Sequence, residues 1–146
     1  MREYIPLYGP KGVTVKVYDD HLIIGGSNAW YHWLHHILPG ARQREIDCAF
    51  EVALIARKHV IRDIRGISVG GCIAQIVASI LRCKCITYGS KRAPRVYAGA
   101  GTHYRHRGDI VPFLPPWRPR MHCVLVGEWR PLWIAHKPSS YWEALQ

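Results

Sequence analysis

The first part of the chain contains two short apolar runs with the spacing of strands. In 13–18 (VTVKVY) apolar and polar residues alternate, which places successive side chains on opposite faces of a strand. In 21–24 (HLII) the run is almost continuously apolar, as in a strand that is buried on both faces. Asp19 and Asp20 lie between the two runs. The pattern therefore predicts two strands joined by a turn.

Further along, apolar residues recur every three or four positions, which is the spacing of one helix face. In 43–59 this spacing relates Ile46, Phe50, Leu54 and Ile55. After residue 68 it relates Cys72, Ile73, Ile76, Val77, Ile80 and Leu81. Two helices are therefore predicted, with a short strand at 60–68 between them.

The second half of the chain is richer in short apolar runs than in helical spacing. Further strands are predicted at 83–90, 102–109, 121–129 and 131–136. A last short helix is predicted at 139–146 (SSYWEALQ). Strands that alternate with helices, as in the first half, are typical of an α/β fold with a mostly parallel central sheet flanked by helices. At 146 residues the chain is predicted to form a single domain, 1–146.

The composition is that of a folded protein, since 49% of the residues are apolar and 21% are charged. No stretch approaches about eighteen apolar residues and no basic-then-apolar leader opens the chain, so neither a membrane span nor a cleaved signal is expected. The cysteines are odd in number and form no C-x-x-C hook: Cys48, Cys72, Cys83, Cys85 and Cys123. Free thiols in a cytoplasmic protein are therefore expected.

The net charge of +10 indicates attraction to a polyanion, either nucleic acid or an anionic lipid surface. The basic residues are dispersed along the chain in ones, twos and threes. No RNP motif, basic helix array or zinc-finger spacing accompanies them. Nucleic-acid binding is therefore the minority interpretation, and contact with an anionic lipid surface, peripheral to a membrane, stays open.

Residues 66–70 (GISVG) spell G-x-S-x-G between the predicted strand and the predicted helix. In this setting a serine can be held on a tight turn as a nucleophile. Gly66 and Gly70 would remove Cβ atoms that collide where strand and helix converge, and the Val69 amide would point at a developing oxyanion. The pentapeptide by itself is a weak signal, and the alternative for Ser68 is an inert helix N-cap.

A nucleophilic serine needs a histidine base and an acid that orients it, and in this setting the chain order is serine, acid, histidine. Asp109 and His136 follow Ser68 in that order, each at the end of a predicted strand. Both are therefore expected over the carboxyl edge of the sheet. Other histidines also follow the serine, namely His103, His106 and His122.

Four segments resemble, in the same order, segments of the class 3 or filamentous-fungal-type lipase family. RGISVGGCIA resembles the family's G-H-S-L-G-G-A turn, and ITYGSKRAP its following strand, T-F-G-x-P-R. GDIVPFLPP resembles its aspartate segment, N-D-x-V-P-x-L-P-P, and is the most specific match. IIGGSNAWYHWLHHI is similar to its F-R-G-S/T segment. The resemblance covers the chain from about residue 13 to residue 145.

The resemblance implies a minimal α/β-hydrolase fold that cleaves carboxylic esters, those of lipids included, through an acyl-serine intermediate without metal or cofactor. Ser68 would be the nucleophile, His136 the base and then the acid, and Asp109 its orienting partner. The oxyanion hole would be formed by the Val69 amide together with the amide and hydroxyl of Ser27.

Two residues beside the implied site depart from the family's pattern. Gly25 stands where the family usually has Arg, and Ile67 stands where it has His next to the serine. Neither belongs to the implied triad, but both positions support it. The chain is also much shorter than typical members, so a reduced sheet and a shallow acyl pocket are expected.

The segment 28–38 (NAWYHWLHHIL) is short and aromatic, and a Pro-Gly pair ends it. It is either a short buried helix or, by its position in the resembling family, a lid that gates the acyl pocket. Its side chains suited to a lipid interface are Trp30, Tyr31 and Trp33. His32, His35 and His36 share its helical spacing, but no carboxylate or Cys with ligand spacing accompanies them, so no metal site is expected.

Two other functions stay open on the sequence. Gly25, Ile67 and the short chain would fit a non-catalytic binding or structural protein on the same scaffold. The positive charge would fit a basic nucleic-acid-associated protein.

Overall fold

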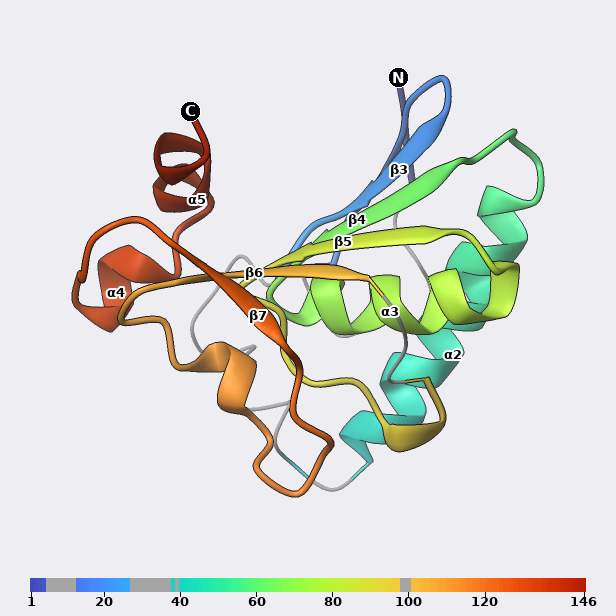
Figure 1. The fold of residues 1–146 in the computed structure, drawn as a ribbon. Helices are drawn as coiled ribbons and strands as arrows, with labels where there is room; N and C mark the ends of the chain where they lie inside the picture. The colour runs from blue at the N-terminus through green and yellow to red at the C-terminus, as the bar shows by residue number, and fades with distance from the viewer. Residues whose placement is uncertain (5–12, 27–37, 39, 98–100) are drawn as a thin grey trace.

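A seven-stranded sheet runs through the part of the chain that the computed structural model describes, residues 1–4, 13–26, 38, 40–97 and 101–146 (Figure 1). In sheet order, which is also chain order, the strands are β1 (Arg2–Tyr4), β2 (Val15–Val17), β3 (His21–Ile24), β4 (Asp63–Ile67), β5 (Lys84–Tyr88), β6 (Thr102–His106) and β7 (Cys123–Val126). The helices are α2 (Ala41–Ala56), α3 (Val69–Leu81), α4 (Leu132–Ala135) and α5 (Pro138–Ala144), with 3-10 turns η1 (Arg95–Tyr97) and η2 (Val111–Phe113).

The strands from β3 to β7 are parallel, and β1 and β2 are added antiparallel at one edge. Parallel neighbours need a crossover, and α2 and α3 supply those from β3 to β4 and from β4 to β5. The predicted α/β class with a mostly parallel sheet is confirmed. Because β3 to β7 point the same way, their carboxyl ends share one edge, where the loops that follow them come together.

Two segments differ from the sequence-based prediction. Arg2–Tyr4 was not expected to form a strand, because three residues are too few to show an alternation. The prediction of a strand at 131–136 is wrong, since Leu132–Ala135 forms α4. A short apolar run does not distinguish strand from helix, and Pro131, with φ −56° and no N–H to leave unpaired, suits a helix start.

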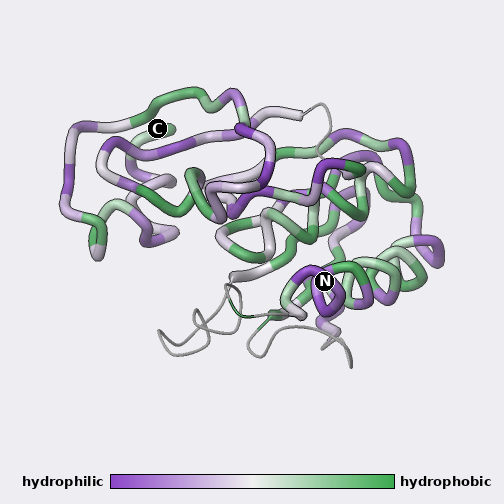
Figure 2. Tube along the Cα trace, turned by 90° about the horizontal axis from the view of Figure 1, so that it is seen from below, coloured by the Kyte–Doolittle hydropathy of each residue, from purple (hydrophilic) through white to green (hydrophobic). Residues whose placement is uncertain are grey.

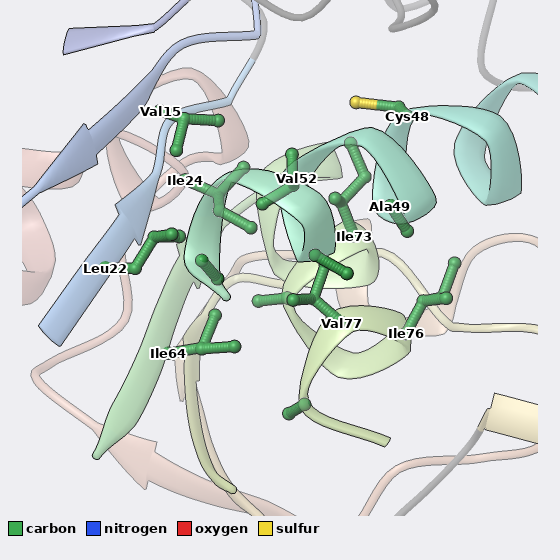
Figure 3. Packing of buried hydrophobic residues seen from close by; sticks show 14 of the residues in the cluster. Val15, Leu22, Ile24, Cys48, Ala49, Val52, Ile64, Ile73, Ile76 and Val77 are labelled. Carbon is green, nitrogen blue, oxygen red and sulfur yellow. The ribbon is translucent and has the colours of Figure 1, made fainter. Parts of the chain in front are cut away.

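The hydrophobic core lies between one face of the sheet and the helices α2 and α3, which also pack against each other. Figure 3 shows Ile24 and Ile64 of the sheet close to Val52 of α2 and Val77 of α3. Every residue of α3 from Val69 to Ala78 is buried. Hydrophobic and hydrophilic residues alternate along α2 (Figure 2), as expected where one face of a helix is covered.

The fully buried apolar residues of α2 are small, and two of the four large residues that the sequence pattern picks out, Ile46 and Ile55, are partly buried against the core. Phe50 and Leu54 are 50% and 62% exposed. The buried residues of α2 include Cys48, Ala49, Val52, Ala53 and Ala56. Small side chains at the contact allow α2 to lie close to α3.

α2 also buries a carboxylate, that of Glu45, which is 0% exposed. Its Oε1 accepts a hydrogen bond from Lys91 Nζ, and its Oε2 accepts one from Arg118 Nη1 at 2.8 Å. The backbone N–H of Lys91 donates to the Ser68 carbonyl at 3.1 Å. A buried charge is tolerated when it is paired, so Glu45 links α2 to the loops at the edge that carries Ser68.

We expect Glu45→Ala to lower the free energy of unfolding by about 3–5 kcal/mol, because it leaves the buried cations of Lys91 and Arg118 without their carboxylate. Urea unfolding measures the loss. Glu143→Ala is the matched control, since Glu143 pairs with Arg130 at the surface and should lose less than about 1 kcal/mol. Equal losses in the two variants would contradict the role given to Glu45.

All five cysteines are free thiols in the structure, and burial raises the pKa of each, to about 12 for Cys48 and Cys85. The thiols of an unfolded chain have a pKa of about 8.5. Above that pH the folded state therefore binds more protons than the unfolded state, and the free energy of unfolding must fall as pH rises.

The expected fall is about 1.4 kcal/mol per pH unit for each buried thiol above about pH 9, with none below about pH 8. Urea unfolding with a reductant present, followed across this range, measures it. The double variant Cys48→Ala, Cys85→Ala should show a shallower fall. An unchanged slope in that variant would show that the thiols do not cause it.

Candidate active site

Ser68 lies on the turn between the end of β4 and the start of α3, with φ 55° and ψ −124°. A non-glycine residue at positive φ is strained, so neighbouring contacts must hold it there. The Ser68 N–H donates to the Tyr88 carbonyl at 3.1 Å, and the Ser68 carbonyl accepts from the N–H groups of Gly71 and Lys91, also at 3.1 Å. The turn is therefore fixed to β5 and to the loop that follows it.

Two glycines of the turn stand where no side chain fits. A Cβ on Gly66 would lie 2.3 Å from the Gly70 carbonyl oxygen, and a Cβ on Gly70 would lie 2.4 Å from the carbonyl oxygens of Ile24 and Gly25. These contacts are between backbones, which cannot move aside as a flexible side chain can. The sequence predicted that strand and helix approach each other closely at both glycines, and the structure has this close approach.

His136 follows α4 and lies between the serine and the acid. Its Nε2 is 2.9 Å from Ser68 Oγ, and its Nδ1 is 2.8 Å from Asp109 Oδ2. A carboxylate only accepts hydrogen bonds, so Nδ1 carries a proton in this arrangement, and Nε2 of the neutral ring is free to accept from the Ser68 hydroxyl. The structure thus brings together the three residues that the sequence selected, although His136 comes from a helix and not from a strand.

Two other histidines that follow Ser68 in the chain, His103 and His106, form hydrogen bonds with other residues. His103 Nδ1 is 2.8 Å from Thr87 Oγ1, and His106 Nδ1 is 2.9 Å from the Arg107 carbonyl oxygen. Both rings are buried. Neither therefore competes with His136 as the partner of Ser68.

Asp109 is completely buried in the loop between β6 and η2. Its Oδ1 accepts from the Val111 N–H at 2.9 Å, and its Oδ2 accepts from His136 and from the Tyr141 hydroxyl. The carboxylate is held in one orientation by donors from its own loop, from the segment after α4 and from α5. It can therefore fix the ring of His136 in turn.

Tyr141 on α5 is a site residue that the sequence analysis missed. Its hydroxyl donates to Asp109 Oδ2 and accepts from the backbone N–H of His106 at 3.1 Å. Burial and the adjacent Asp109 carboxylate raise the pKa of Tyr141 above its ordinary value, so the hydroxyl keeps the proton that it donates. The only signal in the sequence was its place in a short helix just after His136, which is too general to select it.

Four predicted site residues lie outside the described residues, namely Ser27, Trp30, Tyr31 and Trp33. The same holds for His32, His35 and His36, where no metal site was expected. The chain just before Ser27 is described, and a Cβ on Gly26 would lie 2.8 Å from Ser68 Cβ. Val69, the other predicted oxyanion donor, is the first residue of α3, where the amide has no intrahelical acceptor.

The two residues that depart from the family's pattern, Gly25 and Ile67, both lie in or beside the sheet next to Ser68. Gly25 donates its N–H to the Thr14 carbonyl at 2.8 Å, and a Cβ there would meet Thr14 Oγ1, also at 2.8 Å. Ile67 is the last residue of β4 and pairs with Tyr88 of β5. Both positions serve the sheet beside Ser68 without taking part in the hydrogen bonds of His136.

Comparisons of the chain with protein-family models, with curated proteins and with solved structures found no match. Within the described ranges, no group of three or more His, Cys, Asp or Glu residues is arranged to hold a metal ion. In the same ranges no helix has the length and hydropathy needed to cross a membrane.

We expect Tyr141→Phe to lower the free energy of unfolding by about 1–3 kcal/mol, because the buried Asp109 carboxylate loses a donor and the buried His106 N–H loses its acceptor. Urea unfolding measures the loss. Tyr104→Phe is the matched control, since its ring stacks on Tyr88 without a hydrogen bond from the hydroxyl to any described residue. If both variants lose the same stability, the Tyr141 hydroxyl does not support Asp109 in this way.

Proposed function

We propose that the protein is a serine hydrolase that cleaves carboxylic esters, those of lipids in particular, through an acyl-serine intermediate. One observation carries the proposal: an unbroken hydrogen-bonded series runs from Ser68 Oγ through the ring of His136 to Asp109 Oδ2. A serine that only capped a helix would not need this series, and α3 has no hydrogen bond from its cap side chain.

The chemistry follows from the positions of the three groups. Nε2 of His136 takes the hydroxyl proton as Ser68 Oγ attacks the ester carbonyl, and Asp109 stabilises the imidazolium that forms. The tetrahedral intermediate then expels the alcohol, which receives that proton from His136. Water attacks the acyl-serine by the same route, with His136 as base and then as acid, and releases the carboxylic acid. No metal or cofactor takes part.

The oxyanion of the tetrahedral intermediate would be stabilised at the start of α3. The Val69 amide and the positive end of the helix dipole lie next to Ser68. Ser27 would supply the second donor, and the approach of Gly26 to Ser68 supports this assignment. Ser27 itself lies outside the described residues.

Exposed apolar side chains in the segment 129–133, which precedes His136 in the chain, support lipid esters as substrates. Trp129 and Trp133 are 72% and 73% exposed, and Leu132 is 38% exposed. Exposed tryptophans together with a net charge of +10 suit an anionic lipid surface. The lid hypothesis for 28–38 stays a prediction.

Hydrolysis of p-nitrophenyl butyrate and octanoate tests the proposal. We expect Ser68→Ala and His136→Ala each to lower kcat/KM by at least about 10³-fold, and the double variant to lose little more, because the two residues act as a unit. A fluorophosphonate should label the wild-type protein and not Ser68→Ala. Ser139→Ala, which changes an exposed serine of α5, is the matched control and should keep full activity.

Three outcomes would count against the proposal. Activity that survives in Ser68→Ala would place the chemistry elsewhere. A folded wild-type protein that neither hydrolyses the esters nor reacts with the fluorophosphonate would favour a non-catalytic binding protein on the same scaffold. Affinity for RNA or DNA that falls steeply with salt and ignores Ser68→Ala would favour the nucleic-acid alternative.

A further inference from the structure

One cavity, which Ser68 does not line, brings three arginines together. It has a volume of about 340 Å³ and lies against β6, β7 and the turn η2, which is orange in Figure 1. Its cationic residues are Arg92 from the loop after β5, Arg105 from β6 and Arg120 from the loop before β7. None of the described residues that line it is an Asp or a Glu.

Arg92 is 5% exposed and has no carboxylate partner among the described residues. Its guanidinium donates to the carbonyl oxygens of Pro112, Pro116 and Arg118, at 3.1 to 3.3 Å. Carbonyl oxygens satisfy hydrogen bonds but leave the charge without a counterion, which is unfavourable in a buried position. Burial lowers the pKa of Arg92, and the positive charge of Arg120 lowers it further, which is the repulsion expected of neighbouring cations.

The other two arginines are likewise not neutralised by an acid. Arg105 donates from Nη1 to the Asp109 carbonyl oxygen at 3.4 Å and lies over the Phe113 ring, with Cζ 4.8 Å from the ring centroid. Arg120 is exposed and forms no ion pair with a described carboxylate. The carboxylate of Asp109 accepts from the Val111 N–H, from the His136 ring and from the Tyr141 hydroxyl, and it forms no ion pair with the three arginines of the cavity.

The rest of the cavity wall is largely apolar. Pro112 and Phe113 of η2 and Leu125 of β7 line it, and Phe113 and Leu125 are 48% and 44% exposed. Apolar walls beside convergent charged groups are typical of sites for organic ligands, and the volume falls in the range of such sites. The cavity is therefore amphipathic, with cations on one side and apolar surface on the other.

We propose that this cavity binds an organic anion that joins a carboxylate or phosphate head to an apolar body. The planar forks of Arg105 and Arg120 match carboxylate and phosphate oxygens, and the head would supply the negative charge that Arg92 lacks. The apolar body would lie on Phe113 and Leu125. Ser68, Asp109 and His136 do not line this cavity, and the proposal does not depend on ester hydrolysis.

A further cavity, of about 510 Å³, also collects arginines and provides a control. It is lined by Arg42, Arg95 and Arg118, among others. Arg118 is paired there with the buried Glu45, so part of its charge is already neutralised. This difference favours the cavity of Arg92 as the anion site and makes Arg95 a matched position for the same substitution.

Isothermal titration of the whole protein with octanoate and with octyl phosphate tests the proposal, and acetate and inorganic phosphate serve as head groups alone. We expect one saturable, salt-sensitive site for the octyl compounds, with the short anions at least about tenfold weaker because each buried methylene adds affinity. Which octyl compound binds more tightly identifies the preferred head. Unfolding curves show first that each variant is folded.

Arg120→Gln should weaken binding of the octyl compounds by about tenfold, because one charged fork is lost, whereas Arg95→Gln should leave it unchanged. Leu125→Ser, on a different element, should weaken octanoate but not acetate.

Any of three results would overturn the proposal: no saturable binding, equal affinity for inorganic phosphate and octyl phosphate, or binding that Arg120→Gln leaves unchanged. A loss in Arg95→Gln as large as in Arg120→Gln would show that the anion binds in the other cavity, or only by general attraction, and would also reject it.

Discussion

The rest of the structure depends on the close approach of three backbone segments around Ser68. The end of β3 meets the first turn of α3 at Gly70, and the end of β4 meets the same turn at Gly66, at separations that exclude a Cβ. This approach forces Ser68 into positive φ and presents its hydroxyl beyond the carboxyl edge of the sheet. Hydrogen bonds to β5 and to the loop at Lys91 offset the strain, so the turn at Ser68 keeps this shape only when the sheet is formed.

The partners of Ser68 come from segments that have little regular structure of their own. Arg92 stabilises the loop that follows Asp109, because its guanidinium donates hydrogen bonds to the carbonyl oxygens of Pro112 and Pro116. From the other side, Tyr141 of α5 joins Asp109 to the end of β6. A short chain can therefore place an acid and a histidine accurately without adding helices, because a few buried polar contacts replace the packing that longer crossovers would provide.

The sequence was sufficient to predict the elements with periodic apolar residues and the site residues that follow a fixed chain order. The periodic segments of α2 and α3 were predicted as helices, and Ser68, Asp109 and His136 were selected because a nucleophile, an acid and a base must follow in that order. A single contact between residues far apart in the chain produces no pattern in the sequence. The sequence does not reveal the contacts of Tyr141 with Asp109 or of Glu45 with its two cations, because nothing in their spacing relates the partners. A short apolar run such as 131–136 was also assigned wrongly, since local pattern does not decide between strand and helix.

The burial of individual basic residues changes what the net positive charge of the chain implies about its partners. Read from composition, the net charge of +10 indicates a polyanionic partner at the surface. In the fold, Lys91 and Arg92 are 4% and 5% exposed, so they contribute to that total from the interior. Lys91 is neutralised by Glu45, whereas the guanidinium of Arg92 contacts, among the described residues, carbonyl oxygens and no carboxylate. The distinction matters because a surface cation can interact with any polyanion, while a buried cation without a counterion selects for an anion that fits the cavity beside it.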